Sequence, residues 1–224
     1  MDTQNLHPIF WLWIPIALII AQIAIEILVP HELKGALHSE GGPHETLQFI
    51  FTLGGFIIAL LCLKALAKNP KPFLIFWTSC FAFGCFYIAG EEVSWGQHIL
   101  GWATPEFWSG VNDQNETNLH NTSSWLDQKP RLILLIGVVV GGLIIPCVQK
   151  FKPGLLPKMF ETIYPPAILT PTAALAIGIK IIDKIDESLP ETVILSRASE
   201  VEELYLFYFV LLYLVILRRR FLQQ

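Results

Sequence analysis

The sequence is poor in charge. Only 15% of its 224 residues are charged, whereas soluble globular domains carry about 25%. The formal net charge is −4, so the chain offers no basic field of the kind that binds nucleic acid. Because 53% of the residues are hydrophobic, a disordered chain is excluded as well. We therefore expect no nucleic-acid partner and consider a membrane protein first.

The sequence also has few cysteines, and their spacing excludes the usual cysteine chemistry. No two of the four form a Cys-x-x-Cys pair, so neither a zinc ribbon nor a thioredoxin-like motif is present. All of them fall inside apolar runs, where cysteine behaves as a small hydrophobic residue. They are Cys62, Cys80, Cys85 and Cys147.

Long apolar runs are what the sequence has in abundance. A transmembrane helix needs roughly 20 predominantly apolar residues, and several runs approach that length. No lysine or arginine precedes the first run, which favours a retained span over a signal peptide. We predict an all-α, polytopic membrane protein that forms a single six-helix transmembrane domain over residues 1–224. Its predicted spans are residues 9–29, 47–67, 72–90, 132–148, 163–182 and 198–217.

The last two predicted spans are irregular. Residues 163–182 contain three prolines, so we expect a kinked helix there. Residues 204–217 are too short to cross a bilayer, and an extension to full length takes in Glu200, Glu202 and Glu203. Two explanations stay open. Either the three carboxylates enter the edge of the membrane, or the bilayer thins around a short helix.

The charges are sorted by side. Six spans place both termini on one side, and that side collects the basic residues at positions 64–71, 150–158 and 218–220. By the positive-inside rule this side faces the cytoplasm. The opposite side collects every acidic residue except Asp2 and Glu161, and every histidine except His7. We therefore predict cytoplasmic termini and a polar extracytoplasmic face.

The longest connection on that face covers residues 93–130. A structureless loop of this length is uncommon in a compact domain unless it packs or functions. Within it, Thr104 as the N-cap and Pro105 at the first helical position are typical of a helix start, and Gly110 is typical of a helix end. Several tryptophans suit a position at the level of the lipid headgroups. We expect this segment to form an extracytoplasmic cap on the membrane surface.

Two segments of this face carry candidate metal ligands. Glu91, Glu92 and His98 follow the third span, where acidic side chains oppose the helix dipole and so do not stabilise the helix. If the helix continues, Glu91 and His98 share one of its faces. Glu116 and His120 are spaced i, i+4 and could bind one metal from one helical turn. We predict that these five residues hold a divalent ion, which would be zinc, iron or manganese. The alternatives are a solvated helix end and an asparagine-rich loop.

The predicted catalytic residues are Glu91, Glu92 and Glu203. A carboxylate near the membrane edge of the sixth span invites a partner, and Glu203 or Glu200 could serve as a general acid or base. Glu202 has a structural explanation instead, because Ser199 and Glu202 match a capping box. A neighbouring cation, Arg197 or Lys180, is the alternative partner for these carboxylates.

One pattern resembles a known family. It runs Gly-Glu-Glu-x-x-Ser-Trp-Gly-Gln, then Thr-Pro-Glu-Phe, then Glu-Thr-Asn-x-His-Asn, over residues 90–121. This pattern is similar to the signature of a group of bacterial multi-pass membrane proteins whose activity is not known. The resemblance implies a bacterial inner membrane as the location. It implies no reaction, cofactor or site residue.

We expect a metal-dependent integral-membrane hydrolase or headgroup transferase that acts at the extracytoplasmic leaflet on a lipid or lipid-linked substrate. The bound ion would convert a water molecule into a nucleophile near neutral pH, and oxidation at a two-iron site stays open. The main alternative is an accessory subunit of a larger membrane complex, in which the polar cluster is a cork between cap and bundle. An ion or proton carrier is a third alternative, disfavoured by the few polar residues in the cytoplasmic halves of the spans.

Overall fold

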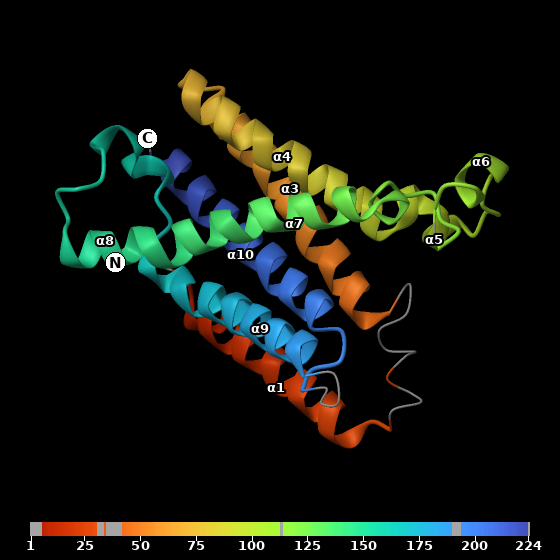
Figure 1. Ribbon diagram of the computed structural model, residues 1–224. Coiled ribbons are helices and arrows are strands. Elements are labelled where there is room, and N and C mark those ends of the chain that lie inside the picture. Colours follow the sequence, from red (N-terminus) through yellow and green to blue (C-terminus); the bar gives the residue numbers. More distant parts are fainter. Residues whose placement is uncertain (1–5, 31–33, 35–41, 113, 190–193, 224) are drawn as a thin grey trace.

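Helices supply the regular structure of the described chain, as predicted (Figure 1). The computed structural model describes residues 6–30, 34, 42–112, 114–189 and 194–223. Among these residues, four helices are long and apolar enough to cross a membrane, and they correspond to the first four predicted spans. They are Ile9–Leu28, Pro43–Leu66, Pro72–Glu92 and Gln128–Phe151.

Two of these four helices are compound. The first consists of a π-helical turn, Ile9–Trp13, followed by α1 (Ile14–Leu28). The fourth consists of α7 (Ser124–Val139), a π-helical turn (Val140–Ile144) and α8 (Ile145–Phe151). The other two are α3 (Pro43–Leu66) and α4 (Pro72–Glu92). Because α7 starts at Ser124, the segment between α4 and α7 is shorter than the predicted cap over residues 93–130.

The last helix, α10 (Ala198–Leu222), forms the core of the bundle. Nearly every side chain between Val201 and Leu217 is buried, on all faces of the helix. α10 packs along α3 on one side and along α9 (Thr170–Ser188) on another (Figure 1). A helix that is hydrophobic all round belongs in the interior of a protein or membrane bundle, and here the other helices surround it.

Three tyrosines of α10 attach it to its neighbours. A phenol hydroxyl buried among apolar groups needs a hydrogen-bond partner. Tyr205 donates to the carbonyl of Pro15 at 2.7 Å, and Tyr208 donates to the carbonyl of Phe10 at 2.6 Å. Tyr213 donates to the carbonyl of Ile163 at 2.7 Å. The first two bonds join the N-terminal helix to the C-terminal one.

The fifth predicted span, residues 163–182, has the wrong bounds. Pro165 and Pro166 lie before the helix, and a 3₁₀ turn at Ala167–Leu169 leads into α9, which extends to Ser188. Pro171 lies in the first turn of α9, where a missing N–H breaks no helical hydrogen bond, so the expected kink is absent from α9. Pro165 and Pro166 mark the approach to the helix because a proline ring disfavours the helical conformation in the residue before it.

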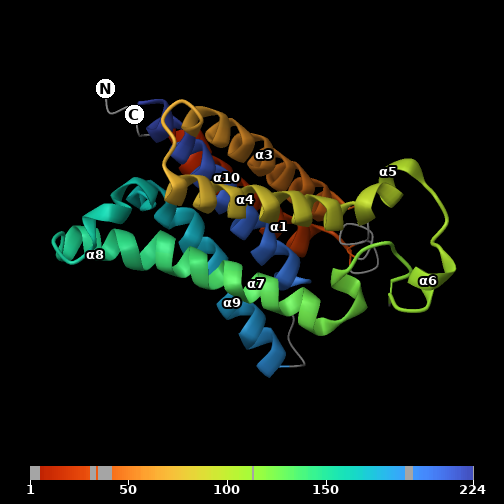
Figure 2. The same cartoon turned by 90° about the horizontal axis from the view of Figure 1, so that it is seen from above.

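The two ends of the bundle differ in chemistry. Both described ends of the chain and α8 lie at one end, and α5 (Gln97–Leu100) and α6 (Glu106–Ser109) project beyond the other (Figure 2). The first end carries the lysines around position 68 and Arg218–Arg220, and we call it the basic end. The opposite, acidic end carries the final turn of α4 and the start of α10. The described residues between Val93 and Ser123 form what we call the lobe.

Candidate functional site

The chain reverses abruptly after α4. Ser94 and Trp95 both adopt left-handed backbone conformations, with φ of 46° and 54°, and Gly96 follows at 104°. Each left-handed residue other than glycine costs roughly 1–2 kcal/mol, so other contacts must hold this turn in place. The Trp95 ring lies against Gly90, where an added Cβ would come within 2.8 Å of the indole. The packing of this turn therefore explains why Gly90 and Trp95 occupy their positions in the motif.

The Glu91 carboxylate joins the two halves of the lobe. One of its oxygens accepts hydrogen bonds from the backbone N–H groups of Leu119 and His120, both at 2.7 Å. The His120 ring nitrogen Nδ1 lies 3.2 Å from the same oxygen, and the indole N–H of Trp95 donates to the other at 2.6 Å. Four donors saturate a carboxylate. Glu91 therefore has a structural role.

Glu116 has an equivalent role on the other side of the lobe. Its Oε1 lies 2.7 Å from Nε2 of His98, and its Oε2 accepts a hydrogen bond from the Ser94 hydroxyl at 2.7 Å. Asn118 and Asn121 donate to the same Oε2. The side chain of Glu116 is 5% exposed, so these bonds replace almost all of its hydration. This carboxylate is saturated as well.

Other polar side chains of the two motif segments, apart from Glu92, also bond within the lobe. Gln97 accepts hydrogen bonds from the backbone and the hydroxyl of Thr117, at 2.8 and 2.9 Å, and donates to Thr104 at 2.8 Å. Asn112 donates to Asn118 at 2.7 Å. Thr104 is thus a bridge inside the lobe and not the predicted helix cap, because α6 has Pro105 at its N-cap. Gly110 does end α6, as predicted.

The predicted pairing of the ligands is wrong. Glu91 and His98 share no helix face because α4 ends at Glu92, and Glu116 lies outside a helix, so it shares no helical turn with His120. The reversal of the chain pairs Glu91 with His120 and Glu116 with His98 instead. At the lobe, Glu91, His98, Glu116 and His120 thus form two cross-linked pairs.

A cavity of about 330 Å³ opens beside these pairs at the acidic end. It collects side chains from α3, α4, α7, α10 and the lobe, and every predicted metal-binding or catalytic residue is on its wall. The polar part of the wall comprises Glu45, Tyr87, Glu91, Glu92, His98, Gln114, Glu116, His120, Asn121, Arg131, Arg197, Ser199, Glu200 and Glu203. Leu126, Leu134 and Phe207 are among the apolar residues that complete it.

The three glutamates at the start of α10 each have a cationic partner. Glu203 lies 2.5 Å from Arg131, and Glu200 lies 3.0 Å from Arg197. Glu202 is buried 3.2 Å from Lys180. Arg197, and not Ser199, occupies the N-cap position of α10, so the predicted capping box with Ser199 is wrong. Buried carboxylates require such partners, since an isolated buried charge is strongly destabilising. The carboxylates therefore enter the helix bundle as ion pairs.

Glu92 differs from every other polar residue of the two motif segments. It makes no hydrogen bond or ion pair with the part of the chain that the structure describes, although it is partly buried and faces the cavity. It experiences electrostatic repulsion from the carboxylates of Glu203, Glu200, Glu45 and Glu91. A carboxylate among like charges is unfavourable, and the lobe gains nothing from this one. The fold alone does not explain why a glutamate occupies position 92.

The predicted metal centre stays a prediction. Within the described residues, no group of three or more histidine, cysteine, aspartate or glutamate side chains is placed to hold a metal ion. Two of the five proposed ligands, Glu91 and Glu116, already use their oxygens inside the lobe. A metal held by the remaining donors would require them to rearrange.

Sequence reasoning missed two features. Arg131, the partner of Glu203, was not predicted, although a basic residue at the start of an apolar run on the acidic side is a usable signal. The second is the identity of the partners of Glu26, an ionisable residue of the first span that is expected to face a partner or a cavity. In this polar cluster Ser196 donates to the Glu26 carboxylate at 2.9 Å, and Lys34 lies 2.7 Å from it. This cluster ties α1 to the start of α10 and lies outside the cavity.

Comparisons with protein families, with curated proteins and with solved structures find no match to this chain.

Proposed function

We propose that this protein is a membrane-embedded enzyme that binds the polar headgroup of a lipid or lipid-linked substrate in the acidic cavity, with Glu92 as its acid–base group. The single observation that carries the proposal is the position of Glu92. It is the one polar side chain of residues 90–98 and 116–121 without a bond inside the described structure, and it faces the cavity. Residues that a fold does not need, at a site lined by charge, are candidates for chemistry.

The wall of the cavity supports an amphipathic substrate. A volume of about 330 Å³ suits a headgroup, since ligand sites generally occupy about 300–1,000 Å³. Charged pairs of α10 with Arg131 and Arg197 line one part of the wall, and Leu126, Leu134 and Phe207 line another. Such a surface can hold a polar group at one side and the beginning of a hydrocarbon chain at the other.

The reaction class that fits is hydrolysis or headgroup transfer. A water molecule or a hydroxyl acceptor attacks the headgroup linkage, its proton passes to the carboxylate of Glu92, and the departing oxygen takes a proton in turn. Arg131 holds Glu203 at 2.5 Å, so Glu203 serves as an orienting charge next to the reacting group. A positioned general base typically contributes about 10²–10⁴-fold to the rate.

The proposed setting is a bacterial inner membrane crossed six times, with the acidic end outside. Ion pairing of the three glutamates supports α10 as a span, because paired charges enter a membrane at lower cost than isolated ones. The basic residues at the other end favour the cytoplasm.

Labelling of single cysteines checks this orientation. In a cysteine-free background, Glu106→Cys in the exposed part of the lobe is expected to react with a membrane-impermeant maleimide in intact cells. Lys152→Cys at the basic end is expected to react only after the membrane is opened. Equal labelling of both in intact cells contradicts the six-span arrangement.

Lipid analysis tests the enzymatic proposal. We expect overproduction of the wild-type protein to deplete one lipid and accumulate another, and Glu92→Gln to slow this conversion by about 10²–10⁴-fold. Glu106→Gln is the matched control, because Glu106 is exposed and lies outside the cavity. The readout is mass spectrometry of total lipid extracts, with tryptophan fluorescence as a check on folding. Identical lipid profiles for the wild type and a folded Glu92→Gln variant contradict the proposal.

The accessory-subunit alternative keeps one supporting observation. Glu91 and Glu116 act as the cork that this alternative requires, since they hold the lobe together at the end of α4. The accessory-subunit alternative gives Glu92 no role. Stoichiometric co-purification of other membrane proteins, unaffected by Glu92→Gln, would favour it.

A further inference from the structure

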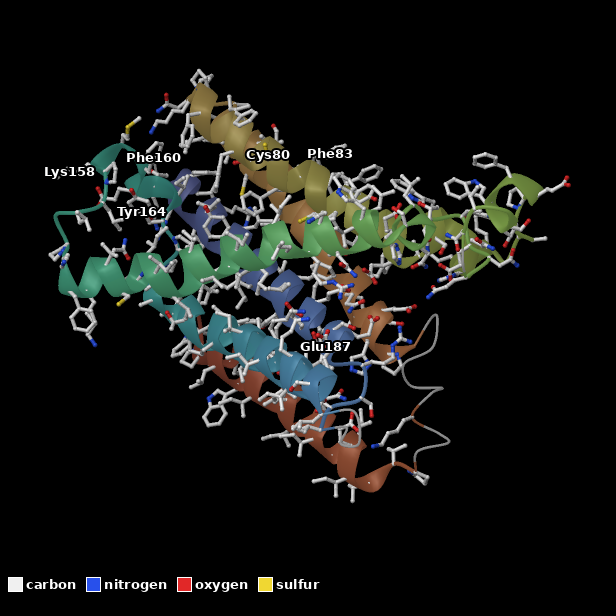
Figure 3. All side chains as sticks on the ribbon, in the orientation of Figure 1. Cys80, Phe83, Lys158, Phe160, Tyr164 and Glu187 are labelled. Atoms are coloured by element: carbon white, nitrogen blue, oxygen red, sulfur yellow. The ribbon has the colours of Figure 1, made fainter. Side chains whose placement is uncertain are left out.

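A second cavity, an apolar groove of about 480 Å³, separates α4 from α7. Phe73, Trp77 and Phe81 of α4 form one wall, and residues between Leu134 and Ile145 form the other. Its floor is the central helix, at Phe209, Val210 and Tyr213. At the basic end the groove reaches Phe160 and Tyr164, which lie close together near the end of α10 (Figure 3).

The polar groups of the two tyrosines and the tryptophan that line the groove are all hydrogen-bonded. The indole N–H of Trp77 donates to the Tyr213 hydroxyl at 2.9 Å, and that hydroxyl donates to the carbonyl of Ile163 at 2.7 Å. The Tyr164 hydroxyl donates to the carbonyl of Pro157 at 2.9 Å. Because these polar groups are hydrogen-bonded, the wall of the groove is apolar. Apolar cavities of this kind exclude water and take apolar ligands.

The groove and the acidic cavity meet. Leu134 lines both of them, and on α10 the cavity wall at Phe207 is followed by the groove floor at Phe209. From Leu134 to Ile145 the helix rises about 16 Å, at roughly 1.5 Å per residue. That is about half of the roughly 30 Å hydrocarbon thickness of a bilayer. A polar site thus borders, at Leu134, an apolar groove of about one leaflet's depth.

We infer that this groove binds one acyl chain of the membrane glycerolipid whose headgroup occupies the acidic cavity. The inference rests on the proposed function and extends it to the substrate's hydrocarbon part. A transmembrane helix of a partner fits the groove less well. Close helix packing uses pairs of small residues, and of Gly137 and Gly141 the second is already covered by Pro165, at 3.1 Å from an added Cβ.

Photolabelling with a fatty acid tests the inference. Cells are supplied with a fatty acid that carries a mid-chain diazirine, which enters their glycerolipids, and membranes are irradiated before the full-length protein is purified. Phe209 and Tyr213 are only 4% and 3% exposed, so lipid outside the groove does not reach them. We expect labelled peptides from this part of α10. Labelling confined to the outward face of α7, at Ile133 and Ile136, overturns the inference.

Two variants that fill the groove sharpen the test. A Cβ added at Gly137 meets no atom within 4 Å, so Gly137→Phe is expected to fold and to reduce α10 labelling at least tenfold. Val140→Trp provides a second obstruction from an exposed position. Gly178→Phe is the matched control, because Gly178 is equally unobstructed and lines neither cavity. Undiminished labelling of α10 in both folded groove variants overturns the inference, as does a cross-linked partner helix in place of lipid.

The lipid analysis separates this outcome from the proposed function. If α10 is labelled but Glu92→Gln leaves the lipid profile unchanged, the groove holds a lipid and the enzymatic proposal fails. If α10 is not labelled but Glu92→Gln stops conversion, the enzyme stands and the acyl-chain site fails.

Discussion

Replacement of Glu91 by alanine is expected to open the lobe. The substitution removes the acceptor of two backbone N–H groups, at Leu119 and His120, and of the Trp95 indole. A fully buried donor left without a partner costs about 1–3 kcal/mol. These three donors are only partly buried, so water compensates part of the loss, and we expect about 1–3 kcal/mol for the three together. Local opening of the lobe then becomes about 5- to 150-fold more frequent. Hydrogen exchange at the amides of Leu119 and His120 measures this change directly.

Two further variants isolate the cause. Glu91→Gln keeps one acceptor oxygen, so its exchange rates should fall between those of the wild type and those of Glu91→Ala. Glu106→Ala removes an exposed carboxylate from the same lobe and should leave both amides protected. If Glu91→Ala leaves exchange at Leu119 and His120 unchanged, then the carboxylate is not the tie between the two halves of the lobe.

Gly142→Ala is expected to destabilise the bundle, although alanine normally favours helices. An added Cβ would lie 2.3 Å from Cβ of Ala173 and 2.9 Å from the ring of Phe209, so α9 or α10 would have to shift. Overpacking of this kind costs about 1–3 kcal/mol. Gly178→Ala meets no atom within 4 Å and should stabilise its helix by about 0.5–1 kcal/mol.

Gly142→Ala and Gly178→Ala are expected to change the free energy of unfolding in opposite directions, which makes this pair of variants informative. Unfolding of the purified protein by a denaturing detergent, followed through tryptophan fluorescence, gives the difference in the free energy of unfolding. Changes of the same sign in both variants would mean that the contact of the π-helical turn with α9 and α10 does not constrain the bundle.

Hydropathy predicted the first four spans because each is a continuous apolar run, and their ends shifted by a few residues. The last two predicted spans were harder to delimit from the sequence. In α9 the apolar run includes prolines that precede the helix, so the run and the helix differ in extent. In α10 the start at residue 198 was predicted, but the helix ends at Leu222 and not at residue 217. Its central position was not predictable, because all the predicted spans are apolar. The tyrosines 205, 208 and 213 are the available signal, since hydroxyls in hydrocarbon require partners on adjacent helices.

The residues of the site were predictable, whereas their pairing was not. Acidic and imidazole side chains concentrated on one side of a membrane protein have reason to meet, and they share the wall of one cavity. Which carboxylate meets which histidine depends on the end of α4 and on the left-handed turn at Ser94 and Trp95. Nothing in the residue spacing specifies those dihedral angles. The turn separates Glu92 from the saturated pairs.

The central position of α10 has a consequence for biogenesis. Domains generally form from the N-terminus as the chain is synthesised, but here the helix that the others surround is synthesised after all the other described helices. Until it arrives, the earlier helices have no common partner, and the carbonyls of Phe10 and Pro15 await the tyrosines that bind them. Translation arrested before α10 therefore leaves membrane-inserted helices without the central helix against which they pack. Cellular quality control can recognise and remove such a form.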